Sequence, residues 1–478
     1  MVMTPQRPPT GPGEPQPLNG RSQPRQGRPL PPSQRGAAAT GRPLPPSQRA
    51  AAVPPVAPAA DARASRPLPP SQRAAAARPV PPSQRAAAAA AAVTAAKEPR
   101  PKQARVVLRQ LTEPASANWV FLLGITIFLI LFGLVMVLSS ASVTDYARTH
   151  DFFGTAARQA SLAIIGVPAM LLVAQFPAVF WRKWVWIIMW AAFGLQLMVF
   201  TTAGLTHGIN RNWVSIFGFT LQPSEFIKLA LVICLGVILS ARQDSLYDAR
   251  ELARSTLPVA GGALALVLFG GDLGTAMVMA ALMLGCAYFG GVPMRYLFLV
   301  MAIGAAGAWA FAMLDGSRVA RITEFYNGVC DYEGGCWQST HATFALAAGG
   351  FFGVGLGNSS AKWSWIPEVE NDFIFAVIGE ELGLLGALVV ILLYVLFAVA
   401  CFRIIASTDD PFTRIVAGGV MTWITVQAFM NIGVVLGLLP VLGVPLPFIS
   451  AGGSSLLASM LAVGVVLSFA KSDRKRAR

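Results

Sequence analysis

Long apolar runs are the feature that most constrains how this chain folds. Ten of them follow residue 118, most of them about 20 residues long, which is the length of a helix that spans a bilayer. Inside a bilayer only helices and closed barrels satisfy their own backbone hydrogen bonds. The sequence therefore predicts an all-α polytopic membrane protein of about ten helices, at 119–139, 159–177, 184–201, 223–240, 257–271, 272–290, 296–313, 373–402, 412–437 and 452–470.

The charge of the chain lies almost entirely in its first part. Charged residues make up 13% of the sequence, against about 25% in an average soluble domain. Residues 1–110 hold 17 Lys and Arg and 3 Asp and Glu, which equals the whole net charge of +14. The basic character therefore belongs to a tail and does not indicate that the membrane domain binds nucleic acid.

The tail contains a short repeat that cannot bury a core. It reads R-P-L-P-P-S-Q-R at Arg28–Arg35, Arg42–Arg49 and Arg66–Arg73, and R-P-V-P-P-S-Q-R at Arg78–Arg85. Residues 1–112 are interpreted as a disordered cytoplasmic tail with polyproline-II segments. It is either a solvated spacer or a docking arm for a partner or for anionic lipid. Residues 113–471 form the transmembrane domain, and 472–478 a short basic cytoplasmic end.

Basic residues in alternate short connections predict the orientation, because they favour the cytoplasmic side. These residues are Arg182, Lys183, Arg242, Arg250, Arg254, Arg295, Arg403, Arg414 and Lys471. Both termini are then cytoplasmic, and residues 314–372 form a long extracytoplasmic loop between helices seven and eight. Loops of this length usually carry function. Cys330 and Cys336 lie in it, either as a disulfide or as two free thiols.

Five ionisable residues lie in the predicted spans, where charge is costly and marks function by default. They are Glu225, Lys228, Asp272, Glu380 and Glu381. Glu225 and Lys228 are three residues apart in Q-P-S-E-F-I-K and so share one helix face. This pair either fixes helix packing or lines a substrate cavity.

Asp372 lies in the stretch richest in candidate groups, W-I-P-E-V-E-N-D-F-I-F-A-V-I-G-E-E-L-G from Trp365 to Gly383. It directly precedes the eighth apolar run, so it is expected at the outer membrane boundary. Glu380 follows eight residues later, about 12 Å deeper at 1.5 Å per residue. Asp372 is either a helix cap or a functional carboxylate at the membrane surface.

Several further residues are candidates for binding. Lys362, Arg211, Arg318 and Arg321 are cations on the predicted outer side, each either a partner for a lipid phosphate or a solvated charge. Ser450, Gly452 and Gly453 lie at the start of the tenth span, as an ordinary helix start or as exposed backbone amides. The run Gly349–Gly357 lacks the Lys-Ser/Thr of a phosphate loop and is interpreted as a re-entrant or flexible turn.

Five motifs occur along the chain in this order: Q-P-S-E-F-I-K, G-D-L-G-T at Gly271–Thr275, W-Q-S at Trp337–Ser339, the Asp372 stretch, and L-P-F-I-S-A-G-G-S-S. Together they resemble the signature series of the SEDS family (shape, elongation, division and sporulation). Leu138–Ser142 and Arg403–Phe412 favour the cell-division branch, with the elongation branch as close competitor. The family commonly has His-Thr-Asp where this chain has Glu370, Asn371 and Asp372, so a role for that histidine does not transfer.

The resemblance implies a glycosyltransferase that polymerises lipid II into peptidoglycan strands at the outer face of the cytoplasmic membrane, with Asp372 as the catalytic residue. As a general base it would activate a sugar hydroxyl. Lys362 and Arg211 would stabilise the departing pyrophosphate, with or without a divalent cation such as Mg²⁺ or Mn²⁺. The intramembrane acids, Lys228, Ser450, Gly452 and Gly453 would line the substrate site.

The resemblance also implies partners: a class B penicillin-binding protein that crosslinks the strands, and other division proteins, with action at the septum. Two other functions remain open, a lipid II transporter and a scaffold for a partner synthase. The position of Asp372 at the outer surface favours the enzyme over the transporter. So does the expected absence of a pair of broken helices in corresponding halves of the chain.

Overall fold

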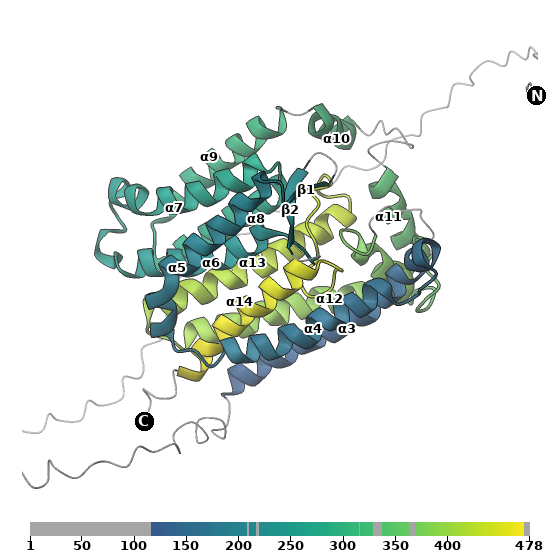
Figure 1. The fold of residues 1–478 in the computed structure, drawn as a ribbon, viewed down its shortest axis with the longest axis horizontal. Coiled ribbons are helices and arrows are strands. Elements are labelled where there is room, and N and C mark those ends of the chain that lie inside the picture. Colours follow the sequence, from purple (N-terminus) through teal and green to yellow (C-terminus); the bar gives the residue numbers. More distant parts are fainter. Residues whose placement is uncertain are drawn as a thin grey trace, which may run out of the picture. The chain divides into compact units, whose positions relative to one another are not determined.

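The computed structural model confirms the predicted membrane fold (Figure 1). It describes residues 116–207, 210–216, 219–314, 316–327, 337–362 and 369–472. Ten helices in these ranges are long and apolar enough to span a membrane, and each overlaps one predicted span. They are α3 (Ala117–Thr149), α4 (Gly154–Val173), α5 (Ala178–Leu197), α6 (Pro223–Ser240), α7 (Ala249–Phe269), α8 (Leu273–Gly290), α9 (Met294–Ala312), α12 (Ile374–Ala406), α13 (Pro411–Val435) and α14 (Gly453–Ser472).

Some of the predictions concern residues outside these ranges. The repeat-bearing tail, the basic end after residue 472, and Cys330 and Cys336 lie outside the described residues, so the tail and the disulfide stay predictions. The other three cysteines, Cys234, Cys286 and Cys401, are buried thiols in α6, α8 and α12, as expected for packing residues.

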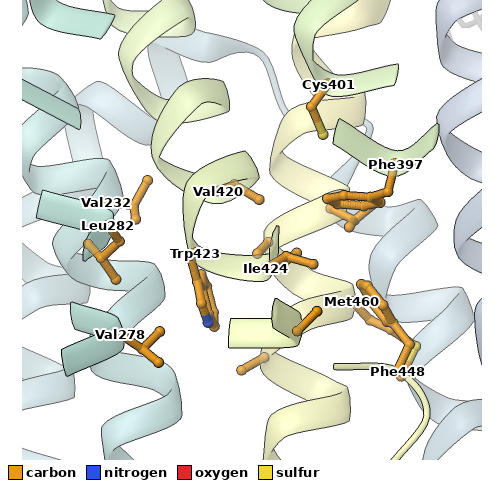
Figure 2. Packing of buried hydrophobic residues seen from close by; sticks show 14 of the residues in the cluster. Val232, Val278, Leu282, Phe397, Cys401, Val420, Trp423, Ile424, Phe448 and Met460 are labelled. Carbon is orange, nitrogen blue, oxygen red and sulfur yellow. The ribbon is translucent and has the colours of Figure 1, made fainter. Parts of the chain in front are cut away.

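Helices α6, α13 and α14 form the centre of the bundle, with 72% to 83% of each apolar segment buried. Helix α13 packs against α6, α8 and α12, and α14 packs against α4. Figure 2 shows Trp423 and Val420 of α13 between Leu282 of α8 on one side and Phe397 of α12 and Met460 of α14 on the other. Helix α9 is peripheral, since only 6% of its apolar segment is buried.

Local sequence signals account for where these helices begin. Proline occupies the first turn of α6 and α13. Backbone N–H groups in the first turn have no acceptor within the helix, so proline, which has no N–H, costs no hydrogen bond there. Asp272 caps α8, because its Oδ1 accepts from the Thr275 amide at 2.9 Å. The fifth and sixth spans, predicted to adjoin at residues 271 and 272, are joined by a very short turn with Gly271 at φ +83°.

One pair of connections joins at the end of the bundle remote from Asp372. Arg182 of α5 pairs with Asp410, which precedes α13, and the Arg182 guanidinium lies 4.8 Å from the centre of the Phe412 ring. Burial raises the pKa of Asp410, but hydrogen bonds from Thr413 and Arg182 and the charge of Arg182 outweigh it, so the pKa lies below its ordinary value. The pair thus fixes the N-terminal end of α13 against α5.

The connection between α5 and α6 departs from the all-α prediction. It holds a three-stranded antiparallel sheet of β1 (Gly204–His207), β2 (Asn210–Ile216) and β3 (Phe219–Leu221). Val214 of β2 pairs with Gly204 on one side and Leu221 on the other. β1 and β3 are only four and three residues long, and the β2 sequence N-R-N-W-V-S-I does not alternate apolar and polar residues, so the sequence pattern predicts no strand here.

The long segment before α12 also contains regular structure, α10 (Gly316–Asn327) and α11 (Trp337–Gly349). After α11 the glycine loop, residues 349–357, packs against a break in α12 at Gly383, where φ is +67° and ψ −166°. The Val354 amide donates to the Glu380 carbonyl at 2.9 Å, and the Leu384 amide donates to the Gly350 carbonyl at 2.9 Å. The loop thereby satisfies backbone groups that the break exposes. No local sequence pattern predicts this broken helix.

Gly353 tests how tightly the loop fits. A Cβ at Gly353 would lie 2.1 Å from the Glu381 carbonyl oxygen, and its φ is +79°. We expect Gly353→Ala to lower the free energy of unfolding by about 2 kcal/mol or more, since backbone strain and overpacking add. Gly357→Ala is the matched control: φ is +84° there, but no atom lies within 4 Å of the new Cβ, so only the strain remains. Equal thermal destabilisation of the two purified variants would contradict this packing.

Candidate functional site

Asp372 lies in the wall of a cavity of about 550 Å³. The wall is built from the first turns of α4, from β2 and β3, from the residues before α12 and from the segment that leads into α14. Its lining includes Arg158, Asn210, Asn212, Gln222, Asn371, Asp372, Gly443, Pro445, Gly452, Gly453 and Ser455. Among the predicted site residues, Asp372, Gly452 and Gly453 therefore line one space.

The backbone around Asp372 is held from two sides. The Asn431 Nδ2 of α13 donates to the Asp372 carbonyl at 2.7 Å and to the Val444 carbonyl at 2.8 Å. Gly443, at φ +66°, brings the chain so close that a Cβ there would lie 3.6 Å from Asp372 Oδ2. Phe373 is the N-cap residue of α12, so Asp372 stands one residue before the N-cap position, in the wall of the cavity.

Asp272 lies behind the cavity and orients two amide side chains of its wall. Its Oδ2 accepts from Asn212 Nδ2 and from Gln222 Nε2, each at 3.0 Å, while its Oδ1 caps α8. Asp272 is 4% exposed. A carboxylate only accepts hydrogen bonds, so it turns both amide NH₂ groups toward itself and both carbonyl oxygens away. Asp272 therefore acts on the cavity through Asn212 and Gln222, which the sequence analysis did not single out.

Glu225 and Lys228 form a buried ion pair beneath the cavity, at 2.8 Å, with each side chain 1% exposed. Lys228 Nζ also donates to Gln427 Oε1 at 2.9 Å. Gln427 in turn donates from Nε2 to the carbonyl of Pro445, a cavity-lining residue, at 3.0 Å. The pair thus supports the cavity floor through one intermediate residue and does not itself line the cavity.

Glu380 and Glu381 hold the segment after the glycine loop against α12. Glu380 accepts from the Ser360 amide at 2.8 Å and from the Ser359 and Ser360 hydroxyls. Glu381 accepts from Ser139 of α3 at 2.6 Å and from Lys362 Nζ at 3.3 Å. Lys362 is 4% exposed and also donates to the Gly357 carbonyl. The structure therefore places all three charged groups in a structural cluster away from the cavity lining.

The guanidinium of Arg211 also points away from the cavity. Its Nη2 donates to the Thr201 carbonyl at 2.6 Å, which braces the sheet. A cation that the sequence analysis missed, Arg158, lines the cavity and donates to Thr220 Oγ1 at 2.8 Å. Its only sequence signal was a positive charge directly before the second apolar run, on the side with few such charges. The side chains of Arg318 and Arg321 lie outside the described part of the structure.

Ser450 organises the turn that precedes α14. Its Oγ accepts from the Leu446 amide at 2.8 Å, and its carbonyl accepts from Gln159 Nε2 of α4 at 2.9 Å. The turn directs Gly452, Gly453 and Ser455 to the cavity, so the N-terminus of α14 faces it. Of the predicted residues in this motif, the two glycines line the cavity and Ser450 supports them.

Comparisons with known proteins agree on the family. A family model described as "Cell cycle protein", which covers FtsW, RodA and SpoVE, matches residues 120–475. Stage V sporulation protein E of Bacillus subtilis is 34% identical over 76% of this chain and 100% of its own length. The probable peptidoglycan glycosyltransferase FtsW of Mycobacterium tuberculosis is 34% identical over 74% of this chain and 67% of its own length. This chain belongs to the FtsW, RodA and SpoVE family.

Solved structures show the same fold. A chain described under "Structural coordination of polymerization and crosslinking by a peptidoglycan synthase complex" has a TM-score of 0.61 and 22% identity, and the match covers 75% of this chain and 98% of that one. The rod shape determining protein RodA of Thermus thermophilus has a TM-score of 0.55 and 23% identity, over 75% and 97% of the two chains. The polytopic helical fold is therefore that of RodA.

Asp272→Asn separates the two roles of Asp272. Asparagine caps helices as well as aspartate does, but its NH₂ group would face the two amides that the carboxylate now holds. We expect a loss of about 2 kcal/mol or more in the free energy of unfolding, because buried donors lose their acceptor. Asp248→Asn is the control, since Asp248 is exposed and accepts only from the Arg250 amide in capping α7. Similar melting temperatures for both variants would contradict the role given to Asp272.

Proposed function

We propose that this chain is a peptidoglycan glycosyltransferase that polymerises lipid II into glycan strands during cell division. The observation that carries the proposal is the carboxylate of Asp372 in the wall of a cavity of about 550 Å³, within a fold of this family. Asn212, Gln222 and Arg158 contribute polar groups to the wall of this cavity, as a sugar-binding site requires.

The proposed orientation places this cavity on the outer side of the cytoplasmic membrane and both termini in the cytoplasm. It rests on the basic residues of the alternate connections, which favour the cytoplasmic side. The pairing of Arg182 with Asp410 supports it, since two connections assigned to the cytoplasm meet there. Asp372 then lies at the outer boundary of α12, where the carbohydrate of a membrane-anchored substrate can reach it.

Asp372 acts as general base in the proposed mechanism. It takes the proton from the 4-hydroxyl of an N-acetylglucosamine as that oxygen attacks the anomeric carbon of the donor sugar. The bond between this carbon and the pyrophosphate oxygen breaks, and the polyprenyl pyrophosphate leaves with the bonding electrons. The attack comes from the face opposite the leaving group, so the anomeric configuration inverts.

Arg158 and the N-terminus of α14 are the proposed partners of the pyrophosphate. Arg158 brings a guanidinium, which suits phosphate oxygens, and Gly452 and Gly453 bring the positive end of a helix dipole to the same cavity. These groups replace Lys362 and Arg211, the sequence-based candidates, whose charged ends bind Glu381 and the Thr201 carbonyl.

A divalent cation stays a proposal with a narrow fit. No group of three or more His, Cys, Asp and Glu lies together in the described ranges, so no all-protein cage for a metal is present there. Mg²⁺ commonly binds one or two carboxylates together with substrate phosphates. Asp372 is the carboxylate that would hold it, and the ion would supply neutralising charge to the pyrophosphate.

The proposed partner is a class B penicillin-binding protein that crosslinks the new strands, consistent with fold likeness to a chain of a peptidoglycan synthase complex. The division branch is proposed over the elongation branch because several similar relatives carry the name FtsW. Localisation of a tagged chain to the septum would support this, and localisation along the whole cell length would contradict it.

A transporter is the second candidate, because the break in α12 resembles the broken helices of carriers. The details of the break favour the enzyme. The glycine loop of the same chain fills it with backbone hydrogen bonds, and no residue of the loop lines the Asp372 cavity. The break is therefore explained by packing without a transported substrate.

Asp372→Asn keeps the shape of the side chain and removes its basicity. We expect polymerisation of lipid II by the purified protein, alone or with its transpeptidase partner, to fall by about 100- to 10,000-fold. Asp151→Asn is the control, because Asp151 is an exposed carboxylate that accepts only from the Phe153 amide. Wild-type polymerisation by the Asp372 variant would exclude the proposed mechanism.

Arg158→Gln tests the pyrophosphate contact. We expect kcat/KM for lipid II to fall by about tenfold or more, since a hydrogen bond to a charged group contributes ~1.5–3 kcal/mol. Arg250→Gln removes the same charge from an exposed position in α7 and should leave kcat/KM unchanged. If both variants behaved like the wild type, the pyrophosphate would have to bind elsewhere.

A further inference from the structure

The connection between α3 and α4 carries three exposed aromatic side chains. Tyr146 is 46% exposed, Phe152 49% and Phe153 58%. The Tyr146 and Phe152 rings are stacked on each other, with their centroids 4.3 Å apart and their planes inclined by 9°. We call these three residues the aromatic platform. Large apolar side chains that gather on an exposed surface mark a binding site, because burying an aromatic ring contributes strongly to binding.

The platform lies beyond the apolar parts of both helices. Helix α3 has 33 residues, or about 50 Å, whereas the hydrocarbon core of a bilayer is about 30 Å thick. The apolar run of α3 ends at residue 139, and Tyr146 follows about 10 Å further along the helix. Phe152 and Phe153 precede the second apolar run, which begins at residue 159. In the proposed orientation the platform therefore stands on the outer side of the membrane.

Local hydrogen bonds hold the platform in one shape. Asp145 of α3 accepts from the Thr155 amide at 2.6 Å and from the Thr155 hydroxyl at 2.8 Å, which ties the end of α3 to the first turn of α4. The His150 amide donates to the Tyr146 carbonyl at 2.9 Å, and His150 ends α3 at φ +57°, a left-handed conformation that is uncommon outside glycine. A surface that is already ordered loses little conformational entropy when it binds.

The platform is continuous with the wall of the Asp372 cavity through α4. Phe153 is the N-cap residue of α4, and Arg158, which lines the cavity, follows five residues later, about 7.5 Å along the helix. Arg158 also donates to Thr220 of β3, so the first turns of α4 are joined to the sheet at the cavity. A long molecule that occupies the cavity can therefore continue over the connection between α3 and α4.

We propose that the aromatic platform binds the glycan strand where the strand leaves the cavity. The inference rests on the proposed function, in which a polymer of sugars passes from the cavity into water. A pyranose ring presents a face of C–H groups, which packs against the negative face of an aromatic ring while the hydroxyl groups stay hydrated. Binding the strand here keeps its reacting end at a high local concentration near Asp372. One enzyme molecule then adds several units before the strand dissociates.

Two other occupants fit the platform less well. The headgroup layer of a membrane favours Trp and Tyr, whose polar groups reach water, but two of the three platform residues are Phe. A stable protein partner covers about 800 Å² on each side of an interface, which is more than three half-exposed rings present. The test distinguishes both from a glycan strand.

The test compares Phe152→Leu with Phe128→Leu. Both replace a half-exposed ring, 49% and 51% exposed, but Phe128 lies in the apolar part of α3. The probe is a lipid-free tetrasaccharide of alternating N-acetylglucosamine and N-acetylmuramic acid, and its binding to the full-length protein in nanodiscs is measured. We expect Phe152→Leu to weaken this binding by about fivefold, the loss expected for one stacked ring. The strands it makes should also be shorter at equal consumption of lipid II, and Phe128→Leu should change neither quantity.

Each other outcome has a definite meaning. Unchanged tetrasaccharide binding by Phe152→Leu would assign the platform to lipid headgroups or to a partner protein and overturn the proposal. In an active enzyme, weaker binding with strands of unchanged length would overturn it too. Tyr146→Leu removes the other ring of the stack and gives the same comparison if Phe152→Leu does not fold. Ring-dependent tetrasaccharide binding by a protein that never polymerises lipid II would uphold the platform and reject the proposed function.

Discussion

A charge inside a bilayer must find its partner within the protein, and this requirement decides which acidic residues of the chain are structural. Glu225, Asp272, Glu380 and Glu381 each accept hydrogen bonds from buried groups, most of them on a different segment of the chain. Each of these carboxylates is therefore used to hold the fold together. Asp372 differs from them, because it stands before α12 in the wall of the cavity. The proposed function assigns the chemistry to Asp372 because of this position in the cavity wall.

Buried amide side chains hold the irregular segments that make the site. A bundle of regular helices presents few polar groups at one point, so the cavity is built from a small sheet, a turn before α14 and the residues before α12. Backbone at membrane depth must be satisfied by protein. Asn431, Gln427 and Gln159 satisfy it here by donating to the carbonyls of Asp372, Val444, Pro445 and Ser450.

Sequence pattern predicted the ten helices because apolarity over about 20 residues is a local property. It also singled out Asp372, Gly452 and Gly453 as candidate site residues, through motifs that resemble a family. It missed the sheet, whose longest strand does not alternate apolar and polar residues, and the break at Gly383, which depends on contact with a distant loop. Lys362 and Arg211 were expected to face phosphate, but Glu381 and the Thr201 carbonyl, partners that no local motif indicates, hold them elsewhere. Arg158 gave no motif, and only the fold brings it to the cavity.

The most direct test determines from which side of the membrane a reagent can reach residue 372. A single cysteine at this position, in a chain whose own cysteines are replaced by serine or alanine, is exposed to a membrane-impermeant thiol reagent in intact spheroplasts. We expect rapid labelling without permeabilisation and protection by added lipid II. Labelling only after the membrane is opened would place the cavity in the cytoplasm and contradict glycan polymerisation at Asp372.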